Sequence, residues 1–580
     1  MPPMAIAERS HWLTGASALR NTSPHLPSVW ASVRKCNRLI AGAKSIEIST
    51  ADHWTKKGFS VLTPSQLPPI VDIDAPVTLD ELAEFQNLQA RFSGSFTRIF
   101  DDPSSLRTVV ILPSLSLDQQ VLSKVTGIHH YEERMLCLLL LLRMPRTRLI
   151  YLTSTPIPET IIDYYLHLLP GVPGGHARQR LKLISCNDAS SAPLTRKILD
   201  RPRMLARIRE AVTDVSSAHM TCYTVTELER KLALALNLPI YGCDPALQHW
   251  GSKSGSRQIF REAEIELPLG FEDLVGGEQI AEALAELKGR KPQLQKAVVK
   301  LNEGFSGEGN AVFDLADAPT GAAMPAWLRD RLPRMAFEAR GMTWDLYEDK
   351  LRSMGGIVEE FIPGAVKRSP SAQLRIDPVG RIEAVSTHDQ VLGGPGGQVF
   401  EGCRFPADRA YRLDIQARGT EVGHILVQKG ILGRFGVDFV SVKEADAWRH
   451  IAIEINLRKG GTTHPFLMLQ FLTDGRYDPE TGEFRTPAGQ SRCYYASDNL
   501  EADRYRGLTP DDLVDIAVAN GLHFHAASGE GVAFHLIGAL SEFGKLGVVC
   551  IGQNHERADA LYRSTMDILD RESAYVDPRT

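Results

Sequence analysis

Three short apolar segments, each separated from the next by a helical pattern, constrain the fold more than any other feature of the sequence. The segments are residues 108–113, 148–153 and 180–185, and the stretches between them, 131–142 and 158–168, have the pattern of helices. Strands that alternate with helices build parallel sheets from βαβ units. The sequence therefore predicts an α/β domain over residues 101–240, which continues as a helical stretch after the third strand.

Composition excludes several classes of function. The chain has 580 residues, of which 43% are hydrophobic and 23% charged, which is ordinary for a folded protein of several domains. A net charge of −5 argues against binding nucleic acid through overall charge. The longest apolar run, Met135–Leu142, is far shorter than the roughly 20 residues that span a bilayer, and the eight cysteines form no CxxC pair. We therefore expect a cytoplasmic protein without a nucleic-acid or membrane partner.

A lysine followed by a glycine-rich hairpin is the first feature that points to chemistry. Lys300 ends one apolar strand, another follows at residues 311–313, and the loop between them contains Gly304, Gly307 and Gly309. Glycine lets backbone N–H groups approach phosphate oxygens closely, and a lysine ammonium suits the same ligand. The segment fits a phosphate-binding lid, although a plain flexible hairpin has the same pattern. The loop after residue 113, by contrast, lacks the GxGxxG of a dinucleotide site.

Two adjacent acids end the next predicted strand. Glu359 and Glu360 follow the apolar residues 356–358 and precede Ile362 and a Pro-Gly break. One interpretation is a strand end with solvated acids. The other is a connection between two lobes, in which the backbone around Glu360 and Ile362 binds the edge of a purine.

The strongest signal is a strand with polar side chains on one face. Over residues 451–458, Glu454, Asn456 and Arg458 alternate with apolar residues, so the polar side chains are expected on one face and the apolar ones on the other. Two oxygen donors about 7 Å apart along a strand suit a hard cation such as Mg²⁺. Asp438, on the preceding strand, adds another oxygen. An amphipathic strand with a salt bridge is the alternative.

Taken in order along the chain, these segments resemble the ATP-grasp superfamily of carboxylate–amine ligases. The resemblance covers residues 240–470 and includes Lys253, a helix after it, and a strand at 265–268 that ends in proline. Within the superfamily, the stretches 392–402 and 456–465 are similar to the pheganomycin-type peptide ligases. The resemblance implies a multidomain α/β and α+β fold. Its parts would be an N-terminal extension of unknown role (1–100), a pre-ATP-grasp βαβ domain (101–240), an ATP-grasp domain (241–475) and a C-terminal domain (476–580) that could bind substrate.

The resemblance also implies a role for each residue. Lys253, Lys300 and the three loop glycines would contact the phosphates of ATP, and Glu359, Glu360 and Ile362 would belong to the adenine site. Asp438, Glu454 and Asn456 would bind magnesium, for which manganese could substitute. Arg458, together with Lys300, would act on the transferred phosphoryl group. The acid that often binds ribose in this family is missing, because the chain reads Ala365-Val366-Lys367-Arg368 at that point.

The implied reaction is ATP-dependent ligation. A substrate carboxylate is activated as an acyl-phosphate and joined to the amine of an amino acid or peptide, which releases ADP and phosphate. A phosphotransferase or a carboxylase would use the same site, and a regulatory protein would bind ATP without turnover. The complete set of Asp438, Glu454 and Asn456 argues against the regulatory protein, whereas the first two differ from a ligase only in their product.

Further polar segments lie outside this set. Residues 386–390 and Arg404 could line an acceptor site, or simply close two strands. His523 and His525 could bind a metal, but spacing places no third ligand, so these residues and His535 are expected to be core or substrate-lining histidines. His129 and His130 fit a helix start.

Overall fold

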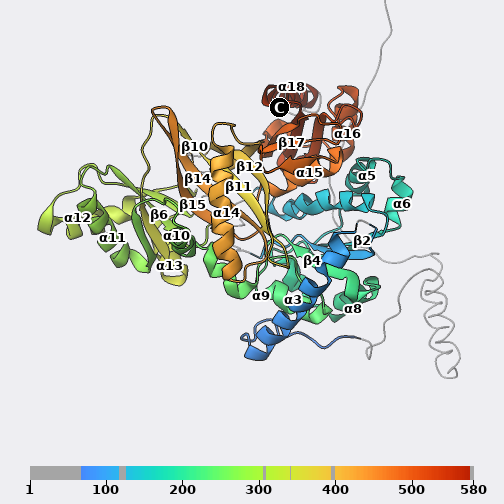
Figure 1. The fold of residues 1–580 in the computed structure, drawn as a ribbon, viewed down its shortest axis with the longest axis horizontal. Coiled ribbons are helices and arrows are strands. Elements are labelled where there is room, and N and C mark those ends of the chain that lie inside the picture. Colours follow the sequence, from blue (N-terminus) through green and yellow to red (C-terminus); the bar gives the residue numbers. More distant parts are fainter. Residues whose placement is uncertain are drawn as a thin grey trace, which may run out of the picture. The chain divides into compact units, whose positions relative to one another are not determined.

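The computed structural model describes residues 67–102, 104–116, 126–304, 309–339, 341–393, 397 and 399–574. All of them belong to one compact unit, Ser65–Thr580. In these ranges the chain forms three larger sheets with helices packed on them, which confirms the mixed α/β and α+β fold class (Figure 1). Within the same ranges, none of the helices has the length and apolar character that a membrane span requires.

The first sheet is parallel, with the strand order β3-β2-β1-β4. Its strands are β1 (Arg107–Leu112), β2 (Thr147–Thr153), β3 (Leu181–Ser185) and β4 (Ala218–Cys222). The first three confirm the predicted βαβ pattern. The fourth corrects the expectation of a continuous helical stretch, because His219 and Thr221 interrupt its apolar pattern although the whole strand is buried.

Helices surround this sheet on both faces. They are α3 (Leu79–Phe100), the 3-10 helix η2 (Ile128–Arg143), α5 (Glu159–His167), α6 (Gly174–Arg178), α7 (Leu194–Leu199), α8 (Pro202–Ala211) and α9 (Glu227–Leu236). Phe85 and Leu88 of α3 pack in one core with Val110 and Leu112 of β1. The end of the predicted N-terminal extension is therefore part of the core of this sheet, while residues 1–66 lie outside the described residues.

The second sheet is antiparallel and carries the predicted glycine hairpin. Its order is β5-β9-β6-β7-β8, with β5 at Gly270–Leu274, β9 at Gly356–Glu360, β6 at Lys296–Leu301, β7 at Asn310–Asp314 and β8 at Ala336–Phe337. The strands β6 and β7 pair with Lys300 opposite Asn310, as the hairpin requires. Helices α11 (Gly276–Arg290), α12 (Met324–Arg331) and α13 (Trp344–Met354) belong to the same part of the chain. The predicted strand at 265–268 is wrong, since pairing starts only at Gly270, after Pro268, which has no N–H to donate.

The third sheet runs through both the predicted ATP-grasp and the predicted C-terminal segments. Its order is β10-β14-β11-β12-β13-β18-β20-β19, and β15 pairs with the other edge of β14. The strands are β10 (Lys367–Arg368), β11 (Pro370–Ile376), β12 (Ile382–Gly393), β13 (Val399–Phe405), β14 (Gly433–Glu444), β15 (Ala447–Asn456), β18 (Cys493–Glu501), β19 (Gly531–His535) and β20 (Lys545–Gly552). Helix α14 (Arg412–Gln428) lies across β11 and β12 (Figure 1). The boundary at residue 475 stays a prediction.

Within the described residues, the C-terminal part of the chain adds four α-helices and a two-stranded ribbon. They are α15 (Thr463–Thr473), the two-stranded ribbon of β16 (Arg476–Asp478) and β17 (Glu483–Arg485), α16 (Pro510–Ala519), α17 (Ala539–Phe543) and α18 (His555–Ser573). Side chains of α15, β18, β20 and α18 share one core with side chains of β1, β2 and η2. The first and third sheets therefore pack through a continuous apolar layer.

A β-bulge in β15 changes which of its side chains face the cavity. Asp438 pairs with Glu454 but Phe439 pairs with Ala452, so Ile453 is an extra residue on β15. Ile453 lines a cavity rather than the core, contrary to the strict alternation expected from the sequence. Pairing ends at Asn456, so Arg458 lies in the loop after the strand and not on its face.

Candidate active site

A cavity of about 510 Å³ gathers the polar residues that the sequence singled out. Residues of the second and third sheets line this cavity, together with residues of helix η2, which packs on the first sheet. The predicted residues among its lining are Lys253, Lys300, Gly304, Glu359, Glu360, Ile362, Asp438, Glu454, Asn456 and Arg458. Residues more than 200 positions apart in the chain thus meet in one site.

Lys253 is placed by the start of helix α10 (Lys253–Glu262). Ser252 caps this helix by accepting a hydrogen bond from the N–H of Gly255 at 3.0 Å. The N–H of Lys253 donates to the carbonyl of Asn302, just after β6, at 3.1 Å. The helix start is therefore tied to the strand that carries Lys300, and both ammonium groups reach the same cavity.

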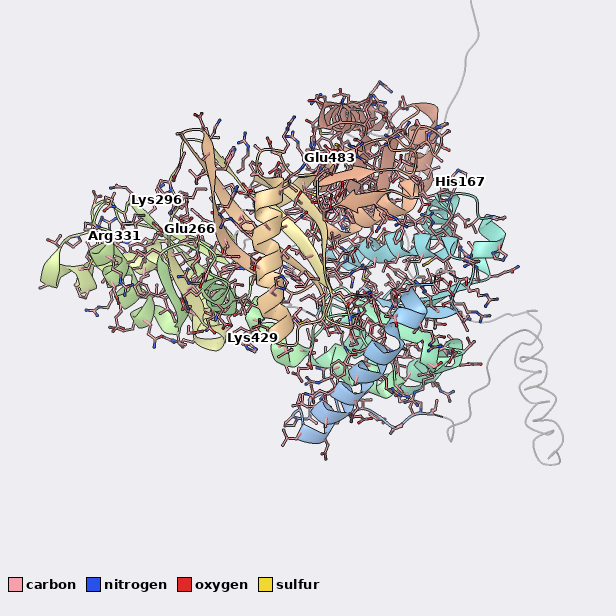
Figure 2. The ribbon with its side chains drawn as sticks, viewed as in Figure 1. His167, Glu266, Lys296, Arg331, Lys429 and Glu483 are labelled. Atoms are coloured by element: carbon pink, nitrogen blue, oxygen red, sulfur yellow. The ribbon has the colours of Figure 1, made fainter. Side chains whose placement is uncertain are left out.

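Lys300 is held by a buried carboxylate. Its Nζ lies 2.7 Å from Glu359 Oε2, and Nη1 of Arg257 lies 2.8 Å from Oε1 of the same residue. Glu359 is 1% exposed, so two cations satisfy a carboxylate that has almost no contact with water. Glu359, expected at the nucleotide, thus acts on Lys300 and fixes its direction. Lys296, at the other end of β6 and labelled in Figure 2, is exposed instead.

The segment after β9 supplies an apolar wall. Glu360 is engaged with the protein, because its N–H donates to the carbonyl of Leu269 at 2.8 Å and its Oε1 accepts from the Leu269 N–H at 3.0 Å. Lys291 contacts its other carboxylate oxygen. Ile362 lines the cavity, and its carbonyl accepts from Lys367 Nζ at 3.2 Å. Further apolar lining residues are Pro268, Val298, Phe361, Leu392, Phe439 and Val440.

Three oxygen-bearing side chains meet at the opposite wall. The Asn456 amide nitrogen lies 3.0 Å from Asp438 Oδ2 and 3.1 Å from Glu454 Oε1, while Gln390 donates to Asp438 Oδ1 at 2.8 Å. Turning the Asn456 amide by 180° directs its oxygen to the same point. Such a donor set fits a hard divalent cation.

The two carboxyl groups differ in electrostatic environment. Burial and the adjacent Glu454 carboxylate raise the pKa of Asp438 to about 7. Burial alone would also raise the pKa of Glu454, but the ammonium of Lys253, in contact with Oε2, outweighs it and lowers this pKa to about 2. The pair thus carries a charged and a readily protonated member side by side, a disposition common at functional sites.

Arg458 enters the cavity from the loop after β15, with Gly460, Gly461 and Thr462 beside it. The intervening Lys459 anchors this loop: its N–H donates to the Tyr223 carbonyl at 3.3 Å, and its Nζ donates to the carbonyl of Cys222. The loop is therefore attached to the end of β4 in the first sheet.

The glycine hairpin is described at both ends. Gly304 lines the cavity, and a Cβ on Gly309 would lie 3.2 Å from the Gly304 Cα, so the two strands approach closely there. The carbonyl of Gly309 accepts a hydrogen bond from the Tyr347 hydroxyl at 3.0 Å. Gly307, with residues 305–308, lies outside the described residues.

The far end of the cavity was not recognised from the sequence. Its polar lining residues are Tyr131, Arg134, Tyr223, Asp498, Asn499 and Lys545. Arg134 forms an ion pair with Asp498 and donates to the Tyr223 hydroxyl at 3.2 Å. A buried arginine at the edge of the apolar run 135–142 is the one local signal that could have indicated this region.

The other histidines singled out from the sequence are placed differently. His388 is buried, with Nε2 2.6 Å from the Tyr494 hydroxyl, and burial lowers its pKa to about 3. Its neighbour Gln390 lines the cavity, whereas Arg404 pairs with Asp559 at 3.2 Å. His535 lies beside His464 and Asp498, a grouping that spacing could not reveal.

Comparison with known proteins finds two matching families and several similar proteins. The family described as "IQCH-like, ATP-grasp" matches residues 245–324 and 320–480, and the family described as "PGM1 C-terminal domain" matches residues 512–565. The chain is 22% identical over 544 residues to IQ motif-containing protein H of Danio rerio, covering 85% of this chain and 51% of that protein. Biotin carboxylase from Campylobacter jejuni, solved as a complex with β-γ-ATP, superposes with a TM-score of 0.47 at 12% identity, covering 79% of this chain and 90% of that one.

A bacterial ligase is similar over nearly its whole length. The chain is 30% identical over 481 residues to L-propargylglycine–L-glutamate ligase of Streptantibioticus cattleyicolor, and the match covers 81% of this chain and 95% of that enzyme. The resemblance to carboxylate–amine ligases is thereby confirmed. The protein belongs to the ATP-grasp superfamily of ADP-forming carboxylate–amine ligases, in the group of the pheganomycin-type peptide ligases.

Proposed function

We propose that this ligase joins the carboxylate of one amino acid or peptide to the amine of another, in the cytoplasm, with ATP as the energy source. The observation that carries the proposal is the lining of a single cavity. Lys253, Lys300 and Arg458 supply cations from α10, β6 and the loop after β15, and Arg134 and Lys545 supply cations from η2 and β20. The first group suits phosphates, and the second suits the carboxylate of an amino acid.

The nucleotide would take the end between the second and third sheets. The apolar wall around Phe361 and Ile362 suits adenine, and the two lysines suit the phosphates. Magnesium bound by Asp438, Glu454 and Asn456 would neutralise negative charge on the distal phosphates. The described oxygen donors favour this ion over softer metals.

The reaction would proceed in two displacements. A carboxylate oxygen attacks the γ-phosphorus of ATP, the bond to the bridging oxygen of ADP breaks, and an acyl-phosphate forms. The amine then attacks the acyl carbon and phosphate leaves with its bonding electrons, after the amine has lost a proton. Lys300 and Arg458 would stabilise the phosphoryl charge, and Lys300 would be kept in place by Glu359. The glycine hairpin would exclude water from the acyl-phosphate.

Product analysis tests the proposal. The enzyme is incubated with ATP, magnesium and pooled amino acids, and the products are separated by chromatography and identified by mass spectrometry. We expect ADP, phosphate and a dipeptide in equal amounts, and a hydroxamate when hydroxylamine replaces the amine. AMP and pyrophosphate as products would contradict an attack on the γ-phosphorus. A phosphoester or a carboxylated product would show that the enzyme is a phosphotransferase or a carboxylase and not a ligase.

A further inference from the structure

A buried cluster of two histidines and an aspartate lies in the wall behind the far end of the cavity. His464 is in the first turn of α15, Asp498 is in β18 and His535 ends β19. All three are at most 3% exposed. Asp498 also lines the cavity, so the cluster borders the region where we place the amino-acid substrate.

The three inward-facing atoms cannot all be joined by well-directed hydrogen bonds at the same time. His464 Nε2 is 3.0 Å from Asp498 Oδ1, His535 Nε2 is 2.7 Å from the same oxygen, and the two nitrogens are 2.9 Å apart. Two donors would meet at this oxygen at an angle of about 60°, with their hydrogens directed at one another. If one ring carried its hydrogen on Nδ1 instead, its Nε2 lone pair would face the carboxylate.

One carboxylate oxygen shared by two buried imidazole nitrogens is costly unless a further group satisfies the three atoms. An ion about 2.1 Å from each of the three inward atoms would lie about 1.3 Å out of the plane of their triangle, with angles of about 80–90° between its bonds to them.

A neighbouring arginine holds the aspartate of the cluster. Arg134 contacts Oδ2 and leaves Oδ1 to the cluster, as partners of metal-ligating carboxylates do.

We propose that His464, Asp498 and His535 bind a divalent transition-metal ion of the zinc, cobalt or iron(II) type, at a site separate from the magnesium site. Two imidazole nitrogens and one carboxylate oxygen favour such ions over magnesium, which prefers oxygen ligands. The ion would fix the carboxylate that orients Arg134 in the cavity. A Cβ on Gly547 would lie 2.2 Å from His535 Nε2, so this glycine lets β20 pass close to the ring.

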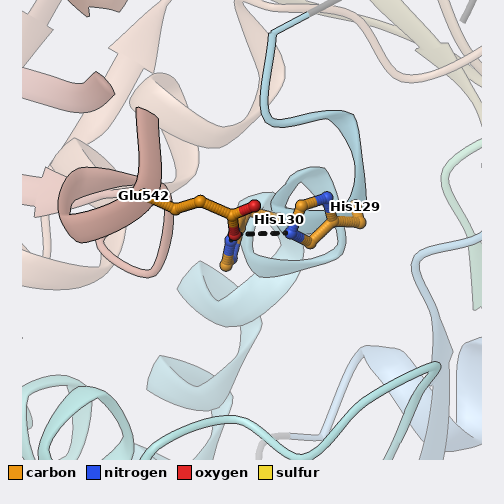
Figure 3. A group of neighbouring side chains, drawn as sticks. All are labelled: His129, His130 and Glu542. Atoms are coloured by element: carbon orange, nitrogen blue, oxygen red, sulfur yellow. Dashed lines mark ion pairs between the residues drawn. The ribbon is translucent and has the colours of Figure 1, made fainter. Parts of the chain in front are cut away.

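Figure 3 shows a second grouping that serves as the control. His129 and His130 lie near Glu542, at 3.5 and 3.8 Å from its Oε2, and the side chains of His129 and Glu542 are 46% and 62% exposed. Solvated side chains of this kind are ordered less firmly and are expected to hold an ion weakly. A His129→Gln/His130→Gln variant therefore removes a histidine pair without touching the buried cluster.

The number of metal ions bound per chain tests this proposal. The full chain, freed of any histidine tag and stripped with EDTA, is loaded with Co²⁺ or Zn²⁺ in excess Mg²⁺, passed through gel filtration and measured by plasma mass spectrometry. We expect one ion per chain in wild type and in the control variant, a d–d absorption band with Co²⁺, and a dissociation constant raised on the order of a hundredfold or more in His464→Gln/His535→Gln. The ion should raise Tm in wild type and not in that variant.

Two results would overturn the proposal. One is wild-type protein that retains no stoichiometric ion and shows no Co²⁺ band, which would leave the cluster as a hydrogen-bonded network. The other is an ion that the His129→Gln/His130→Gln variant loses and the His464→Gln/His535→Gln variant keeps. The Co²⁺ band of the wild type gives the answer even if the cluster variant fails to fold.

Discussion

Replacing Lys300 by methionine separates the two roles that this lysine could have. Methionine keeps the unbranched side chain and removes the ammonium. The carboxylate that Lys300 contacts at 2.7 Å keeps a second partner, because Arg257 lies 2.8 Å from the other oxygen of Glu359. We therefore expect a stability loss of about 1–2 kcal/mol, rather than the roughly 3–5 kcal/mol of an unpaired buried charge.

In Lys300→Met, the loss of binding free energy for ATP should be at least as large as the loss of folding stability. A charge-assisted hydrogen bond contributes about 1.5–3 kcal/mol, which corresponds to a Kd for ATP raised about 10- to 150-fold. Lys296→Met removes the same charge from the exposed end of the same strand and should leave the Kd unchanged. The Lys296→Met variant therefore controls for any long-range electrostatic effect of removing one positive charge.

Calorimetric titration with ATP and excess magnesium at fixed ionic strength measures both variants, and thermal unfolding of the same samples measures stability. A Kd for ATP that rises less than about threefold in Lys300→Met, as little as in Lys296→Met, would contradict a phosphate contact of Lys300. Lys300 would then serve only to neutralise Glu359, and the phosphate site would lie elsewhere.

Three further changes test separate parts of the structure. Glu454→Gln keeps the shape of the side chain and removes a proposed magnesium ligand, so turnover should fall on the order of a hundredfold or more and should no longer respond to a magnesium titration. Gly255→Ala would bring a Cβ to 2.0 Å from the carbonyl oxygen of His249, so it should lower the free energy of unfolding by about 1–3 kcal/mol, measured by urea denaturation. Burial lowers the pKa of His219 to about 3, so the unfolded chain binds one more proton between about pH 3 and 6.5 and stability falls as the pH falls through that window. At pH 5 this costs about 2 kcal/mol relative to pH 7, and His219→Phe, which keeps the stack on Phe92, should lose less stability over the same pH change.

Each of these three predictions has an outcome that would contradict it. Wild-type turnover in Glu454→Gln would remove the metal assignment. Gly289→Ala, at a helical position with open space around it, should stabilise slightly, and an equal loss in both glycine variants would mean that the contact with His249 is unimportant. Identical pH profiles of wild type and His219→Phe would show that this histidine titrates normally in the fold.

Local patterns predicted the elements whose signal lies in one segment. β1 and β2 each carry four consecutive apolar residues, 109–112 and 149–152, and Glu454 and Asn456 alternate with apolar residues within one strand, so these elements could be identified. The bulge at Ile453 depends on how β14 pairs with β15, and no local pattern encodes that register. Arg134 and Asp498 lie in one ion pair although 364 positions separate them, so their meeting follows only from the packing of η2 against the C-terminal part of the chain.

The pairing of β13 with β18 has a consequence for substrate choice. Through this pairing the strands that carry Asp498 and Lys545 are hydrogen-bonded into the sheet that carries Asp438 and Glu454. Strands joined in one sheet do not hinge against each other, so any opening of the nucleotide site must come from the separate sheet of β5–β9. The span from Asp438 and Glu454 to Asp498 and Lys545 then stays constant through turnover. We expect the enzyme to discriminate sharply by substrate length, because this wall cannot adjust to a longer or shorter molecule.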